Sequence, residues 1–405
     1  MKYLLVSRFN VPNIGDLVIA NKLSEIISKY GEVTKYNLTG DPYKFKDIDS
    51  VEPTNYSFKY AIVNFISKIG LNFLIDKYIK LKTKYLNIPS INSVDNDKFI
   101  DQFDVIIVGG GNMIMSINDD ESNVSNFDKY VQIAKKNHLP LFAMDIGIGP
   151  FRNSFHLNSA IQSLNDCTVI SFRDKQSYDL YISNGGIKEK AEISIDPVFL
   201  YKYKNVKGNI EEATEPTIGI NIIDSRHFRD KKINYKDTVE NYQSLINRLG
   251  HVYRIILYTS TKEDQSALDD VYKGIINKKK VKKININGLK DLLNLYDGID
   301  ILIGTRMHSM IIAYTKYIPV IGLSWQPKVD ALFDIIDSSS MLFNFGNLSN
   351  EILNIENLVK KLSNNLNYEN KQISNQLKVI RSKANINEEI LSDLSHKKIN
   401  YWEEN

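Results

Sequence analysis

Residues 300–330 read DILIGTRMHSMIIAYTKYIPVIGLSWQPKVD, and this stretch indicates the fold of the chain. Two apolar runs, at 301–303 and 320–323, enclose a helix-like segment, which predicts a strand–helix–strand unit. Potential cations gather where each strand gives way to a loop, namely Arg306, His308 and Lys328. Ligands bind at this edge of an open parallel sheet, so the stretch predicts a crevice for a small, multiply anionic molecule.

The composition indicates a globular enzyme with two domains. The chain has 405 residues, of which 43% are apolar and 24% charged, and its net charge is +3. So small a charge, with no arginine-rich stripe, argues against nucleic-acid binding. Cys167 is the only cysteine, which excludes internal disulfides and cysteine-rich metal sites; we expect no metal. We find no signal-peptide pattern and no membrane-spanning apolar run, so we expect a cytoplasmic protein.

The first half of the chain alternates strands and helices. Residues 2–7 and 32–38 predict strands, and the helix between them begins near Asp16. A favourable interaction with the helix dipole and a role in substrate binding explain Asp16 equally well, so both interpretations stay open. Residues 103–108 predict a strand, which leads into a loop formed by Gly109, Gly110 and Gly111 and followed by Asn112. Glycines allow the backbone to approach its surroundings closely, as either a bound substrate or a tight turn requires. The spacing fits neither a dinucleotide fingerprint nor a P-loop.

Two further strand ends in this half carry candidate residues. Gly149 belongs to a second glycine loop, after the predicted strand at 139–144. Arg173 follows the predicted strand at 168–172, again on the ligand edge of the sheet. A structural ion pair with the neighbouring Asp174 is an equally good explanation of Arg173.

The pattern predicts an α/β protein of two Rossmann-like domains with the linker within 201–216. The first domain covers 1–205, the second covers 216–348, and a helical tail covers 349–405. The first domain contains a helical insertion at 40–100, and its centre at 55–90 interleaves apolar residues with lysines: Lys68, Lys77, Lys80, Lys82 and Lys84. A basic amphipathic helix of this kind binds an anionic membrane surface peripherally, or else forms a lid whose lysines are merely solvated.

The ordered motifs of the chain resemble those of the polysaccharide pyruvyl transferase family, whose members have a GT-B-like fold with two Rossmann-like domains facing across a cleft. The resemblance covers most of the chain. Its motifs are Asn13-Ile14-Gly15-Asp16, Gly109-Gly110-Gly111, Gly149-Pro150-Phe151, Arg173-Asp174 with Ser177 and Leu180, Asp196-Pro197-Val198-Phe199, and Gly304-Thr305-Arg306-Met307-His308-Ser309 followed by Pro319-Val320-Ile321 and Lys328. Two positions depart from the family pattern: Ile146 replaces a frequent glutamine, and Tyr317 replaces a glycine.

The resemblance implies transfer of pyruvate from phosphoenolpyruvate, a co-substrate rather than a cofactor, to two hydroxyls of a sugar, giving a cyclic ketal. It implies an acceptor in surface or capsular polysaccharide synthesis and allows a lipid-linked oligosaccharide. In this interpretation His308 is the acid and Asp16 the base. The donor is held by Arg173, Arg306, Lys328 and Ser309, and the substrates are lined by Asn13, Gly15, Asn112, Gly149 and the three glycines. Two alternatives stay open: a GT-B glycosyltransferase that uses a nucleotide sugar, and a sugar-binding protein without catalysis. The sequence does not indicate an oligomeric state.

Overall fold

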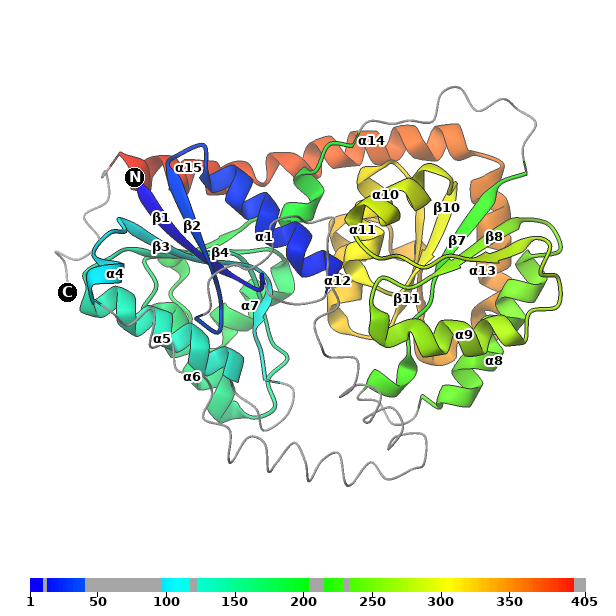
Figure 1. Ribbon diagram of the computed structural model, residues 1–405, viewed down its shortest axis with the longest axis horizontal. Helices are drawn as coiled ribbons and strands as arrows, with labels where there is room; N and C mark the ends of the chain where they lie inside the picture. The colour runs from blue at the N-terminus through cyan, green and yellow to red at the C-terminus, as the bar shows by residue number, and fades with distance from the viewer. Residues whose placement is uncertain (10–12, 41–96, 117–121, 204–214, 229–232, 397–405) are drawn as a thin grey trace. The chain divides into compact units, whose positions relative to one another are not determined.

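The structure is a computed structural model of the chain (Figure 1). It describes residues 1–9, 13–40, 97–116, 122–203, 215–228 and 233–396. The predicted insertion at 40–100 and its five lysines therefore lie almost wholly outside the described residues, as does most of the predicted linker. Among the helices that the structure describes, none is both long and apolar enough to cross a membrane.

The chain divides into two compact units, each built on one parallel six-stranded sheet, which confirms the predicted α/β class with two domains. Unit 1 comprises Met1–Pro12, Asp16–Pro197 and Lys383–Asn405. Unit 2 comprises Asn13–Gly15 and Val198–Ser382. The division at Pro197 lies a few residues before the predicted boundary near residue 205.

The sheet of unit 1 has the strand order β2-β1-β3-β4-β5-β6. Its four inner strands are buried along almost their whole length, because helices cover both faces of a parallel sheet. The order reverses between β1 and β3, where the chain returns to the opposite side of β1. The strands are β1 (Lys2–Ser7), β2 (Glu32–Asn37), β3 (Val105–Ile114), β4 (Leu141–Ile148), β5 (Val169–Phe172) and β6 (Ala191–Ile193).

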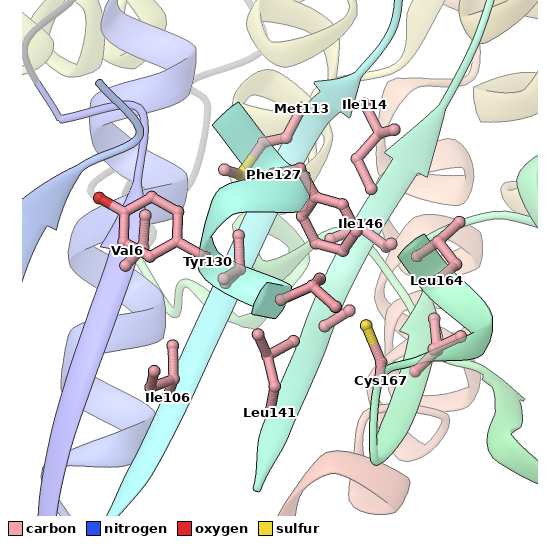
Figure 2. Close-up of a cluster of buried hydrophobic side chains, with 14 of the residues drawn as sticks. Val6, Ile106, Met113, Ile114, Phe127, Tyr130, Leu141, Ile146, Leu164 and Cys167 are labelled. Atoms are coloured by element: carbon pink, nitrogen blue, oxygen red, sulfur yellow. The ribbon is translucent and has the colours of Figure 1, made fainter. Parts of the chain in front are cut away.

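Helix α5 (Ser122–Lys136) buries one apolar stripe against the sheet of unit 1. In α5 the buried residues recur at helical spacing: Val124, Phe127, Val131 and Ala134. Figure 2 shows Phe127 and Tyr130 of α5 over the neighbouring strands that carry Val6, Ile106 and Leu141. The helices that precede the tail are α1 (Ile14–Ile27), α4 (Asp97–Ile100), α5 (Ser122–Lys136), α6 (Ser154–Asn165) and α7 (Lys175–Ser183).

Strands β3 and β4 are longer than the sequence predicted, because each continues through its glycines. β3 includes the three glycines at 109–111, and β4 includes Gly147. The pairing of β3 with β4 shifts register between Asn112 and Ile114. Gly110 and Gly111 have φ angles of +85° and +81°, which a residue with a β-carbon rarely adopts. The glycines thus permit an irregular extension of the strand where a loop was expected.

Unit 2 has the strand order β12-β11-β10-β7-β8-β9. One face of its sheet packs against α8, α9 and α13, and Tyr242, Leu268 and Ile355 from these helices are buried there. The strands are β7 (Thr217–Asn221), β8 (Arg254–Tyr258), β9 (Val281–Lys283), β10 (Ile301–Gly304), β11 (Val320–Ser324) and β12 (Leu342–Asn344). The helices are α8 (Tyr235–Leu249), α9 (Gln265–Lys273), α10 (Leu289–Asp297), α11 (Met307–Thr315), α12 (Pro327–Ile335) and α13 (Leu348–Ser363).

The tail predicted at 349–405 is divided between the two units. α13 and α14 (Leu366–Ser382) belong to unit 2, where Nε of Arg381 donates to the backbone oxygen of Phe199 at 2.8 Å. α15 (Asn385–Ser395) belongs to unit 1, where Nδ2 of Asn387 donates to Oδ1 of Asp145 at 2.7 Å. The tail therefore completes both units instead of forming a separate part.

Candidate functional site

The strand order of unit 2 reverses between its two central strands, β7 and β10. Open α/β sheets bind ligands beyond the carboxyl ends of their strands at such a reversal. Asn221 is the last residue of β7, and Thr305 directly follows β10. The predicted cluster around Arg306 thus begins at the point where this class of sheet holds its ligands.

Buried hydrogen bonds from β7 hold the loop that follows β10. The hydroxyl of Thr305 donates to the backbone oxygen of Asn221 at 3.1 Å and to its Oδ1 at 3.3 Å. The backbone N–H of Arg306 donates to the same Oδ1 at 3.2 Å. Asn221 and Thr305 are both completely buried. Sequence analysis missed Asn221, although a polar residue at the end of an apolar strand was the available signal.

A buried carboxylate fixes the direction of the Arg306 side chain. Nη2 and Nε of Arg306 donate to Oδ2 of Asp264 at 2.7 Å and 3.0 Å. Asp264 also accepts from the hydroxyl of Thr261 at 2.9 Å and from the backbone N–H of Asp224 at 2.9 Å. The side chain of Arg306 is 23% exposed, whereas that of Asp264 is 0% exposed. Asp264 therefore holds the guanidinium on its buried side, and the rest of the guanidinium remains accessible, as an anion-binding arginine requires.

His308 and Ser309 lie in the first turn of α11, but their surroundings differ. His308 is partly buried. Gly15 groups with unit 2, and a β-carbon on it would lie 2.1 Å from Nδ1 of His308, so only glycine leaves room for the imidazole. Ser309 is 2% exposed, and its backbone oxygen accepts from the hydroxyl of Tyr296 at 2.9 Å. Ser309 thus lies within unit 2, and its predicted donor-binding role stays a prediction.

Lys328 lies in the first turn of α12, which follows the strand next to β10. The preceding loop is tied to the Arg306 loop, because Nε1 of Trp325 donates to the backbone oxygen of Thr305 at 2.9 Å. The Trp325 ring stacks on Phe228 with a centroid separation of 4.4 Å. These contacts fix the loops that carry Arg306 and Lys328 relative to each other, a role of Trp325 that sequence analysis missed.

The predicted residues of unit 1 gather where its own strand order reverses, between β1 and β3. A β-carbon on Gly111 would lie 3.8 Å from Oδ1 of Asp16, so the structure brings these two predicted residues together. Asp16 lies in the first turn of α1, and its Oδ2 is 3.9 Å from Nη1 of Arg8. Both explanations of Asp16, the helix dipole and a substrate role, remain compatible with this position.

The other predicted lining residues have local partners. In unit 2, Oδ1 of Asn13 accepts from the backbone N–H of Gly15 at 3.0 Å. In unit 1, Nδ2 of Asn112 donates to the backbone oxygen of Gly149 at 2.7 Å, which joins the ends of β3 and β4. Asn112 therefore shapes the edge of the sheet, and its contact with a substrate stays a prediction, as does that of Gly109 and Gly110.

Arg173 is buried and paired with two carboxylates. Its Nη1 is 3.3 Å from Oδ2 of Asp196, and its Nε is 3.4 Å from Oδ2 of Asp174. Asp174 is also the N-cap of α7, since its Oδ1 accepts from the backbone N–H of Ser177 at 2.7 Å. Arg173 is only 2% exposed. These contacts support the structural explanation of Arg173, while its role in donor binding stays a prediction.

Asp145 is a second buried charge-bearing residue near this edge. Nδ2 of Asn387 donates to it and also to Oγ of Ser194 at 2.9 Å, and the backbone N–H of Asp145 donates to Oγ of Ser171 at 2.9 Å. Burial raises the pKa of Asp145 to about 7, and the nearby Asp196 acts in the same direction. Sequence analysis missed this residue, because its partner Asn387 is 242 positions away along the chain.

Within the described ranges, no three or more His, Cys, Asp or Glu side chains gather so that they could hold a metal ion. In unit 2, Arg306, His308 and Lys328 lie at the starts of α11 and α12. In unit 1, Asp16 lies beside Gly111, and Arg173 lies beside Gly147.

Comparison with known proteins agrees with this architecture. The chain is similar to Anabaena Alr3699/HepE, solved with UDP and glucose, with a TM-score of 0.54 and 11% identity over 98% of this chain and 99% of that one. It is similar to UDP-GlcNAc 2-epimerase from Neisseria meningitidis, solved with UDP-GlcNAc, with a TM-score of 0.54 and 12% identity over 97% and 100%. No curated protein matches it. These likenesses show the GT-B-like fold, and the model of the polysaccharide pyruvyl transferase family matches residues 13–327, so the chain belongs to the polysaccharide pyruvyl transferase family.

Proposed function

We propose that this protein transfers pyruvate from phosphoenolpyruvate to two hydroxyls of one sugar and forms a cyclic ketal. The observation that carries the proposal is the arrangement at the β7–β10 reversal. There the accessible guanidinium of Arg306 and the partly buried His308 share the start of α11. A cation, an imidazole and a helix N-terminus together suit a small anion that must be protonated.

The donor has two anionic groups, a phosphate and a carboxylate, and each needs fixed positive charge. Arg306 can bind one of them through its planar guanidinium, because Asp264 holds it in one orientation. The backbone N–H groups of the first turn of α11 provide a further anion site. Lys328, in the first turn of α12, provides the second side-chain cation. For Arg173 a role in donor binding stays a prediction, because Asp174 and Asp196 already pair with its guanidinium.

His308 then acts as the acid. It gives a proton to the terminal carbon of the enol, which becomes a methyl group, and the central carbon becomes electrophilic. One sugar hydroxyl attacks this carbon and loses its proton to a base, for which we propose Asp16. The carbon–oxygen bond to phosphate breaks, phosphate leaves with the electron pair and takes up the proton of the second hydroxyl, and that oxygen closes the ketal. The products are the ketal and inorganic phosphate.

The acceptor is proposed to be a sugar of a lipid-linked glycan precursor, which requires the enzyme to work at the cytoplasmic face of the membrane. The basic segment at 55–90, outside the described residues, is the proposed point of peripheral attachment. Each lysine near an anionic bilayer contributes about 1 kcal/mol before salt screening. Co-sedimentation with anionic liposomes should therefore decrease with salt and with charge reversal at Lys77 and Lys80. Protein that stays in the supernatant at low salt would contradict attachment and leave the lid interpretation.

The activity is tested by incubating the protein with phosphoenolpyruvate and candidate lipid-linked sugars. We expect phosphate release together with a mass gain of one ketal on the sugar. His308→Ala should lower turnover by about 10²- to 10⁴-fold. Arg306→Ala and Lys328→Ala should also weaken the binding of phosphoenolpyruvate in calorimetry, since they remove charge that pairs with the ground state. If UDP- or GDP-sugars raise the melting temperature and phosphoenolpyruvate does not, the glycosyltransferase alternative is correct.

A further inference from the structure

In the side-chain amide of Asn221, the oxygen has hydrogen-bond partners, whereas the nitrogen has none among the described residues. Its Oδ1 accepts from the backbone N–H of Arg306 and from the hydroxyl of Thr305. Its Nδ2 is buried and has no hydrogen-bond partner among the residues that the structure describes. Asn221 is 0% exposed. A buried amide nitrogen without an acceptor lowers the stability of the fold, so we expect an acceptor beside this Nδ2.

The amide cannot be turned over to relieve this. The backbone N–H of Arg306 can only donate, so exchanging the two ends would place an NH2 group against that N–H. Nδ2 and Oδ1 are bonded to the same carbon, and Oδ1 contacts the amide of Arg306. Nδ2 therefore lies beside Arg306, which is the N-cap of α11.

The acceptor that fits here is an anion. Arg306 makes no side-chain cap of α11, so the first N–H groups of this helix have no partner from that side chain. The helix dipole adds positive potential at the same place, and the guanidinium of Arg306, which pairs with Asp264 on one side, has further N–H donors. Asp264, the carboxylate that pairs with Arg306, already accepts from Arg306, Thr261 and Asp224, so both of its oxygens have donors.

We propose that Asn221 binds the donor directly: its Oδ1 sets the start of the Arg306 loop, and its Nδ2 donates a hydrogen bond to the phosphate or carboxylate held at α11. This assignment rests on the proposed function for the identity of the ligand as phosphoenolpyruvate. The anion site itself follows from the β7–β10 reversal and the unsatisfied amide, and would equally serve the diphosphate of a nucleotide.

Asn221→Asp is the first variant: it keeps the shape and the Oδ1 acceptor, replaces the donor by a carboxylate oxygen and adds a negative charge. The matched control is Asn344→Asp, at the end of β12, where the exposed side chain serves as an acceptor for the N–H of Gly346 at 2.8 Å. Each protein is titrated calorimetrically with phosphoenolpyruvate, inorganic phosphate and UDP. We expect Asn221→Asp to weaken binding by about 10- to 100-fold, as loss of a hydrogen bond to a charged group does, and Asn344→Asp to bind like the wild type.

Titration with the three ligands distinguishes the proposed pyruvyl donor from the proposed role of Asn221. If the wild type binds UDP and not phosphoenolpyruvate, the pyruvyl donor is wrong, and the effect of Asn221→Asp on UDP still tests the anion site. Unchanged affinity of Asn221→Asp for whichever ligand binds would overturn the role of Asn221, as would a wild type that binds none of the three. If Asn221→Asp fails to fold, a crystal structure of the wild type with phosphoenolpyruvate decides the matter. Nδ2 must then lie within hydrogen-bond distance of an anionic oxygen, and an Nδ2 facing protein or water refutes the proposal.

Discussion

Two neighbouring glycines of β3 have nearly the same φ angle but different surroundings. A β-carbon on Gly110 would lie 2.3 Å from Cγ2 of Ile19 and 2.8 Å from Cδ1 of Leu23, whereas one on Gly111 would lie 3.5 Å from Cδ1 of Ile19. Gly111→Ala therefore meets only the unfavourable backbone conformation, about 1–2 kcal/mol. Gly110→Ala adds a clash in the core, about 1–3 kcal/mol more. Urea unfolding of both variants measures the difference, and equal losses would contradict this account of the strand.

Arg173 and Arg306 form a second pair for comparison. The side chains of Arg173 and its partner Asp196 are each 3% exposed, while Arg306 is 23% exposed over its buried partner. Arg173→Ala leaves two buried carboxylates uncompensated and should lower the free energy of unfolding by about 3–5 kcal/mol, with partial recovery on adding Asp196→Asn. Arg306→Ala should cost less, because water can reach its place. Wild-type stability of Arg173→Ala, with loss of donor binding alone, would show that Arg173 serves the ligand and not the fold.

At the scale of elements, the burial of Asp145 within β4 should make stability depend on pH. The pKa of Asp145 is raised from 3.8 to about 7, so the folded protein holds a proton that the unfolded chain loses at lower pH. Stability contributed by this group is complete below about pH 4 and falls as pH rises to about 7, with a slope of at most about 1.4 kcal/mol per pH unit.

Asp145→Asn has no titratable carboxyl at this position, so it should remove this dependence of the free energy of unfolding on pH. It keeps the shape of the side chain. The comparison is urea unfolding from pH 5 to pH 8, with Asp101→Asn, at an exposed position of the same unit, as the control. The same slope in the wild type and in Asp145→Asn would show that Asp145 is ionised throughout this range.

At the scale of the whole molecule, the path of the chain predicts which unit depends on the C-terminus. Residues after Ser382 return to unit 1, where Leu391 and Leu394 are buried. Removing 383–405 should therefore expose the end of β4 and increase hydrogen exchange in β4, β5 and β6, while exchange in β7 to β12 stays unchanged. Glu388→Ala is the control, because it removes only an exposed ion pair with Lys29, worth about 0–1 kcal/mol. Increased exchange in unit 2 instead would contradict the division of the chain.

Local patterns were sufficient to predict the α/β class, the strand at 2–7, the strand–helix–strand unit around Arg306 and the position of Asp16 in the first turn of a helix. These features depend on the spacing of apolar residues and on the residues at strand ends, which act over a few positions. The same reasoning placed Arg306 and Lys328 at one edge of a sheet, because parallel strands bring their carboxyl ends to the same edge.

Tertiary structure alone decided which polar groups pair. Asp264 lies 42 positions from Arg306, Asn221 lies 85 positions from it, and Asn387 lies 242 positions from Asp145. No spacing rule acts over such distances, since these contacts depend on which strands are neighbours and where the last helix returns. Only the folded chain shows that Arg173 is neutralised and buried while Arg306 stays accessible. The sequence by itself determined which types of residue are available for the site. The packing of distant segments determined whether each charged side chain is buried with a partner or accessible to a ligand.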